Sequence, residues 1–152
     1  MTRGMELSEA QIRRYSRHIL LPDVGGVGQQ RLLAARVAID VTPPLASAAV
    51  ALAYCAAAGI GHLRLTGAVD DPVTPDDVRV AILLASDDLG RPRAEALAAR
   101  LRALNPDVDV APGDAALRLD APATDDVADA LIAGGAAAAR LVAALARGEL
   151  QS

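Results

Sequence analysis

One stretch of this sequence constrains the fold more than any other: "RVAIDVTPPLASAAVALAYCAAAGIGHLRL", residues 36–65. Its pattern predicts a short apolar strand over 37–41, a turn, a long apolar helix over 45–58 closed by Gly59, and a second strand over 62–66. Two short strands joined through one helix are typical of a parallel pair with a crossover connection. The sequence therefore predicts an α/β fold in which helices pack on a mostly parallel sheet.

The turn inside this stretch reads Thr42-Pro43-Pro44, and residues 41–48 contain no glycine. In nucleotide-binding α/β proteins, glycines after the first strand let backbone amides approach phosphate. Proline has no amide hydrogen to donate. The frame of a nucleotide-binding unit is thus combined with a turn that lacks the usual phosphate donors.

The 152 residues are expected to form one domain, with an N-terminal helical segment over 1–35, a βαβ core over 36–120 and C-terminal helices over 121–152. In the first segment, Ser8 and Gln11 form a capping-box pattern that starts a helix through about His18. The glycines at 25, 26 and 28 precede the first strand instead of following it, so we interpret them as a hinge between helices.

After residue 66 the pattern predicts a loop with one helical turn, a helix over 92–104 that stops at Asn105-Pro106, and short strands in "DVDVA" and "ALRLD". Thr124 is expected to cap a helix through about Ile132. A separate alanine-rich helix is expected to follow and to close at Gly148.

Composition excludes several classes of function. All 15 basic residues are arginine, which excludes Schiff-base lysine chemistry and a P-loop lysine. A formal net charge of -4 argues against a nucleic-acid partner. Cys55 is the only cysteine and lies among alanines, so we interpret it as a buried apolar residue and not as a reactive thiol. His18 and His62 have no companion ligands at metal-binding spacing, and no metal site is expected.

Nothing in the sequence predicts a membrane location. The first residues contain no apolar leader segment. Residues 41–63 are free of charge, but their alanines and glycines are only weakly apolar, which favours a buried helix over a membrane span. A cytoplasmic protein without a membrane partner is expected.

Three motifs in order resemble one known family. They are Arg14-Tyr15-Ser16-Arg17-His18, the corner Gly59-Ile60-Gly61-His62, and Gly90-Arg91-Pro92-Arg93 opening a helix that ends in Leu104-Asn105-Pro106. Together they resemble the E1-like adenylyltransferases, the ThiF/MoeB/HesA family related to ubiquitin-activating enzymes, over roughly residues 7–110. The resemblance implies a shortened Rossmann-like E1-type domain, ATP and magnesium as cofactors, dimers, and a ubiquitin-like sulfur carrier or a peptide as partner.

The sequence departs from that family at the residues that carry its chemistry. The position of the ribose-binding carboxylate falls near Thr66-Gly67, and Asp70 and Asp71 follow some residues later. The family's Asn and Arg in the next loop align with Asp77 and Val80. The nucleophilic and zinc-binding cysteines have no counterparts, and the chain is too short to contain the region that carries them.

Two basic residues of this chain match basic positions of the family. Arg17 matches an arginine that family members extend into a neighbouring subunit's ATP site, and Arg93 stands where the family has its phosphate-binding lysine. Both also fit as solvated helix-surface residues, and the sequence leaves the choice open. Asp125 and Asp126 match either the family's metal-binding Asp or an acidic first helical turn.

Two functional hypotheses follow. In the first, the chain is a catalytically degenerate E1-like domain, not itself an enzyme, that binds no cofactor and works as a scaffold or inactive partner subunit. Its partner would be an E1-like protein in a homodimer or heterodimer, or a carrier protein or peptide. In the second, it is an active ATP-dependent adenylyltransferase with Arg17 and Arg93 on phosphate and Asp70 or Asp71 on ribose. A different dinucleotide-binding module and a diverged domain without its own role remain weaker alternatives.

Overall fold

The computed structural model describes residues 6–124 and 126–151. Its helices are α1 (Glu9–Arg14), α2 (Ser16–Ile19), α3 (Gly25–Ala34), α4 (Ala46–Ala58), α5 (Pro75–Val80), the 3-10 turn η1 (Ser86–Asp88), α6 (Arg93–Leu104) and α7 (Val127–Arg147). Its strands are β1 (Arg36–Asp40), β2 (His62–Thr66), β3 (Asp109–Pro112) and β4 (Leu117–Leu119).

The strands form one parallel sheet in the order β3-β2-β1-β4. In register, Val37 pairs with Leu63 and Leu117, and Ile39 pairs with Leu65 and Leu119. These apolar residues all lie on one face, because side chains one strand apart in register point the same way. The predicted parallel α/β sheet is confirmed, with β1 one residue earlier than expected.

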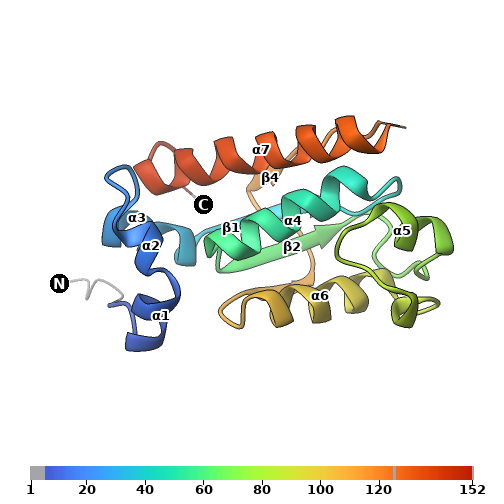
Figure 1. Ribbon diagram of the computed structural model, residues 1–152, viewed down its shortest axis with the longest axis horizontal. Coiled ribbons are helices and arrows are strands. Elements are labelled where there is room, and N and C mark those ends of the chain that lie inside the picture. Colours follow the sequence, from blue (N-terminus) through green and yellow to red (C-terminus); the bar gives the residue numbers. More distant parts are fainter. Residues whose placement is uncertain (1–5, 125, 152) are drawn as a thin grey trace.

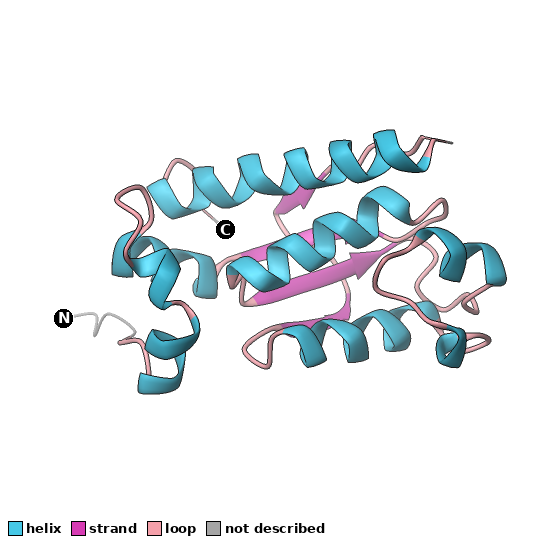
Figure 2. Cartoon of the chain, in the orientation of Figure 1, coloured by secondary structure: helices cyan, strands magenta, loops and turns pink. Residues whose placement is uncertain are grey.

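Helices α4, α6 and α7 all pack on that apolar face of the sheet (Figures 1 and 2). Leucine, isoleucine, valine and alanine side chains from the strands and the three helices make one continuous core. Most helix contributions are alanines, so helix backbones lie close to the sheet and to one another. The result is a Rossmann-like arrangement with a helical layer on one side.

The opposite face of the sheet is polar. Strand β2 alternates buried leucines with the partly exposed residues His62, Arg64 and Thr66, and β1 exposes both its ends, Arg36 and Asp40. Arg64 binds Asp109 of the neighbouring strand at 2.7 Å. Parallel sheets are usually covered on both faces and apolar throughout. Here the polar pattern explains how one face is stable in water.

Two glycines make the corner between α4 and β2. Gly59 ends α4 with φ of 93°, a left-handed conformation that favours glycine. A side chain on Gly61 would overlap the carbonyl group of Leu33, since α3 crosses the corner there. The glycines of this motif are therefore required by packing.

The helix α7 packs along α4 through glycine and alanine. A side chain on Gly134 would overlap the backbone carbonyl of Ser47, and Ala138 is fully buried. The sequence prediction of two helices here was wrong: α7 is continuous, and Asp126 instead of Thr124 is its N-cap. By length and composition α7 is apolar enough to cross a membrane, yet here it lies against α3 and α4.

The N-terminal segment covers the amino end of the strands. The capping box of Ser8 and Gln11 is confirmed, but the first helix breaks at Tyr15. The Tyr15 side chain is buried, and its hydroxyl accepts a hydrogen bond from Asn105 at 2.8 Å. The glycine cluster at 25–28 is the first turn of α3, so its interpretation as a hinge was wrong.

Candidate functional site

The turn after β1 opens on a cavity of about 380 Å³ at the carboxyl edge of the sheet. In parallel α/β sheets this edge is where ligands bind. The walls come from the turn and the start of α4 (Pro43, Pro44, Ala46), from α5 (Asp76, Asp77, Arg79, Val80) and from the segment that begins α7 (Thr124, Val127).

The turn itself is organised by a carboxylate. Asp40 ends β1, and its Oδ1 accepts a hydrogen bond from the backbone N–H of Thr42 at 2.7 Å. The contacts with Thr42 lower the pKa of Asp40 from its ordinary value, so the group is an anion at neutral pH. Pro43 and Pro44 follow, joined by a cis peptide bond. A negative charge and two residues without amide hydrogens thus stand at the end of the first strand.

The neighbouring strand end leaves no room for a side chain. Gly67 has φ of 80°, and a Cβ atom there would overlap the side chains of Asp40 and Thr42. This glycine and Thr66 lie near the position at which the family resemblance implies a ribose-binding carboxylate. The backbone conformation and the crowding both favour glycine at this point.

Arg93 is buried in an ion pair. Its guanidinium donates to the Asp77 carboxylate at 3.0 Å and to the carbonyl oxygen of Ala68 at 2.6 Å. The side chains of Arg93 and Asp77 are only 2% and 3% exposed. Asp77 also accepts from the Thr74 backbone, completing the cap of α5. The guanidinium is therefore held by protein groups and turned away from solvent.

The four residues predicted from sequence to bind nucleotide lie in different places. Asp71 is exposed, with a carboxylate oxygen 3.9 Å from the Arg93 guanidinium. Asp70 is also exposed but lines a separate cavity between α6 and β3. Arg17 is exposed on α2, at the amino end of the sheet, far from the turn after β1 (Figure 1). The fold thus brings Arg93 and Asp71 together but leaves Asp70 and Arg17 apart from them.

The described part of the chain contains no cluster of side chains that could bind a metal ion. No group of three or more His, Cys, Asp or Glu residues is positioned to hold an ion within residues 6–124 and 126–151. Asp125 lies outside the described residues, and Asp126 is the N-cap of α7, accepting from the Asp129 backbone at 2.9 Å. Cys55 is fully buried, and desolvation raises the pKa of its thiol to about 12.

The arginines near the cavity are paired with carboxylates of the same chain. Of the nearby cations, Arg93 is bound to Asp77, and Arg79 is paired with Asp76 at 3.3 Å. The Asp40 carboxylate adds charge of the same sign as phosphate. A phosphate group needs amide donors and cations at this edge of the sheet.

Asp40 was missed as a site residue by sequence reasoning. The signal was present, because an acidic residue ends the predicted strand immediately before Val-Thr-Pro-Pro. The Asp77–Arg93 pair left a weaker signal, since the two residues are sixteen positions apart and belong to different helices. Only their convergence in space identifies them as partners.

The chain matches one protein-family model and is similar in sequence to several known proteins. The model described as "ThiF family" matches residues 15–137. The SAMP-activating enzyme E1 of Haloferax volcanii is 41% identical over 111 residues, covering 73% of this chain and 40% of that protein. The sulfur carrier protein ThiS adenylyltransferase of Escherichia coli is 38% identical over 104 residues, covering 68% of this chain and 40% of that protein.

Solved structures give the same fold. The crystal structure of PaaA matches 95% of this chain and 50% of its own length, with a TM-score of 0.61 and 25% identity. In the sequence comparisons, the chain spans about two fifths of the length of each of the two curated relatives named above.

Proposed function

Because the chain belongs to the ThiF family of E1-like proteins, we propose that it is a catalytically degenerate member that works by association. Its role would be that of a scaffold or non-catalytic partner subunit in a system that modifies a ubiquitin-like carrier protein or a peptide. Two relatives are named for activating a SAMP and adenylating the sulfur carrier ThiS, which makes a carrier protein a plausible partner.

The turn after β1 carries this proposal. Adenylate transfer requires the phosphates of ATP to be held by donors at this strand end. In this chain the Thr42 amide is bound by the Asp40 carboxylate, and the next two residues are prolines. The anionic carboxylate would repel a bound phosphate, and the prolines contribute no amide donors.

The second support is the Asp77–Arg93 pair. The resemblance places a phosphate-binding lysine at Arg93 and an asparagine at Asp77. With an aspartate at 77, the cation at 93 has a buried counter-ion 3.0 Å away. Releasing Arg93 toward a ligand would leave Asp77 buried and unpaired, which is costly. The pair therefore favours a structural role for both residues.

Arg17 supports the association part of the proposal. It is exposed on α2 and takes part in none of the ion pairs found among the described residues. Since it lies at the opposite end of the sheet from the turn after β1, it cannot serve that turn in the same chain (Figure 1). A partner subunit's nucleotide site is where its charge would act.

Calorimetric titration with ATP and Mg²⁺ tests the degenerate assignment. We expect no binding tighter than about 1 mM, which is weaker than −4.1 kcal/mol. Micromolar binding would refute the assignment.

Co-expression with an E1-like protein tests the association. Arg17→Ala should lower that partner's adenylation rate. The control is Arg13→Ala, an exposed neighbour that pairs with Glu9, and it should leave the rate unchanged.

The alternative is an active adenylyltransferase with an atypical nucleotide site. The observation in its favour is the cavity of about 380 Å³ beside the start of α4, where a helix N-terminus is available to an anion. Pyrophosphate exchange in the presence of a carrier protein separates the two hypotheses. Activity that is lost in Arg79→Ala, at the cavity wall, would favour the alternative.

A further inference from the structure

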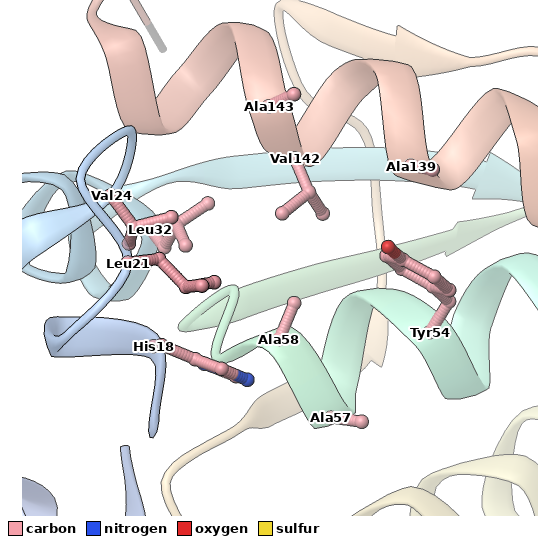
Figure 3. Close-up of a pocket in the computed structure, with 10 residues that line it drawn as sticks. All are labelled: His18, Leu21, Val24, Leu32, Tyr54, Ala57, Ala58, Ala139, Val142 and Ala143. Atoms are coloured by element: carbon pink, nitrogen blue, oxygen red, sulfur yellow. The ribbon is translucent and has the colours of Figure 1, made fainter. Parts of the chain in front are cut away.

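An apolar groove lies between α2–α3, α4 and α7 (Figure 3). Its volume of about 390 Å³ falls within the roughly 300–1,000 Å³ of small-molecule sites. Val142 of α7 and Tyr54 of α4 point into it from facing helices (Figure 3), and the lining residue Leu32 is only 1% exposed, so the groove reaches the core. Apart from His18 and the Tyr54 hydroxyl, its lining is leucine, valine and alanine.

A buried glutamine beside the groove fixes the orientation of its own amide. Gln29 is 0% exposed, and its Nε2 donates a hydrogen bond to the carbonyl oxygen of Ala58 at 3.1 Å. Because a carbonyl oxygen can only accept, this contact identifies the nitrogen end of the amide. The oxygen end, Oε1, therefore faces His18, whose Nδ1 lies 3.2 Å away.

This second contact assigns the tautomer of His18. Since Gln29 Oε1 can only accept, His18 Nδ1 must carry a hydrogen and donate it. In the neutral imidazole the other nitrogen, Nε2, then has no hydrogen and is an acceptor. Among the described residues, Nδ1 is the only atom of this ring with a hydrogen-bond partner. The ring lines the groove and points from α2 toward α4 (Figure 3), so it supplies an acceptor at one end of an apolar space.

The acceptor is held in place by packing. A Cβ atom on Gly59 would overlap the side chains of Gln29 and Tyr15, so glycine there is what allows both to lie under the corner. The Tyr15 ring in turn stacks on the His18 ring, with the centroids 6.0 Å apart. His18 is thus fixed by a hydrogen bond on one edge and by a ring on one face. A ligand that uses a preorganised group loses little affinity to ordering it.

We propose that this groove binds an uncharged small molecule with an apolar body and a hydroxyl group at one end. The hydroxyl group donates its hydrogen to Nε2 of His18, and the apolar body lies along the leucine, valine and alanine lining toward Tyr54. No Arg, Asp or Glu lines the groove, so an ionic group would lose hydration there without a counter-ion of fixed charge. The site is separate from the cavity beside the turn after β1, and it does not rest on the proposed function.

NMR titration at pH 8 tests the ligand class with two isomers. The probe is 4-propylphenol, and its isomer 4-ethylanisole has the same atoms but no hydrogen to donate. We expect the phenol to bind with a Kd below about 1 mM, as its small size allows. The anisole should bind about three- to tenfold more weakly, which is the usual effect of one hydrogen bond. The anion 4-ethylbenzoate should bind more weakly than the phenol as well.

Two variants locate the site. His18→Phe keeps an aromatic ring but removes the acceptor, so it should weaken the phenol about three- to tenfold and leave the anisole unchanged. A loss of packing alone would weaken both. Ala139→Leu fills the groove and should weaken both ligands at least tenfold, whereas Ala136→Leu, on the same helix but outside the lining, should weaken neither.

The tautomer can be tested in the unchanged protein. Nitrogen-15 NMR of the imidazole rings at pH 8 should show the hydrogen of His18 on Nδ1. A hydrogen on Nε2 would overturn the inference, and so would equal affinities for the phenol and the anisole. Absence of phenol binding at about 1 mM would also overturn it, and capture of a protein that Ala139→Leu abolishes would then assign the groove to that protein. The ATP titration bears on the proposed function alone, so the two failures are distinguishable.

Discussion

The guanidinium of Arg93 lies 3.0 Å from the carboxylate of Asp77, with both side chains almost completely buried. The family resemblance implies a phosphate-binding lysine at the position of Arg93 and a loop asparagine at the position of Asp77. In this chain the two residues form an ion pair with each other, and the pair links the start of α6 to the start of α5.

Removing one member of this pair is expected to destabilise the fold. Arg93→Met would leave the Asp77 carboxylate buried without a counter-ion, at a cost of about 3–5 kcal/mol. Asp77→Asn keeps an oxygen for the Thr74 cap, so the double variant Asp77→Asn/Arg93→Met should cost less than the two single changes added together. Urea denaturation measures the free energies, and strict additivity would contradict the pairing.

Neighbouring glycines of α7 should respond oppositely to alanine. Gly134→Ala is expected to destabilise the protein, because the new methyl group would meet the Ser47 backbone and force α7 away from α4. Gly135→Ala should stabilise it by about 0.5–1 kcal/mol, since only a Val50 methyl group lies near, at 3.6 Å, and alanine favours the helix. Equal effects in thermal denaturation would mean that the α4–α7 contact is looser than described.

The buried carboxylate of Asp88 should contribute to acid unfolding. Burial raises its pKa, but hydrogen bonds from the Ala85 backbone and Arg100, with the charge of Arg91, outweigh it and lower the pKa below its ordinary value. A lowered pKa in the folded state gives stability that is complete above about pH 4 and is lost as pH falls through the folded-state value.

The measurement is unfolding free energy between about pH 6 and pH 2. Asp88→Asn should be less stable at pH 6 and should lose less stability than the parent chain on acidification. Asp87→Asn, an exposed neighbour, serves as the control. If the unfolding free energies of Asp88→Asn and the parent chain fell by the same amount on acidification, Asp88 would not contribute to this pH dependence.

Cys55 should be unreactive in the folded protein. Its thiol is fully buried, and desolvation raises its pKa to about 12, so almost no thiolate exists at pH 8. Labelling with a disulfide reagent should require unfolding and should accelerate with urea in step with the loss of helical signal. Rapid stoichiometric labelling without denaturant would contradict the burial.

The sequence by itself determined the strands, the crossover helix, the glycine corner before β2 and the family. These follow from local periodicity, helix capping and short motifs that a single segment displays. The two prolines of the turn after β1, which have no amide hydrogen to donate, were also visible, because this depends on residue identity alone.

Only the tertiary structure decided which charges are available to a ligand. Arg93 and Asp77 are apart in sequence and became a buried pair only when α5 and α6 were placed. The continuity of α7 through Gly134 and Gly135 is another case, since a glycine pair predicts a helix break, whereas in the fold Gly134 lies inside the helix against the Ser47 backbone of α4. The uncovered polar face of the sheet and the open groove of the helical layer likewise depend on where α7 lies. Local sequence patterns do not predict that position, because it is set by contacts between segments far apart in the sequence.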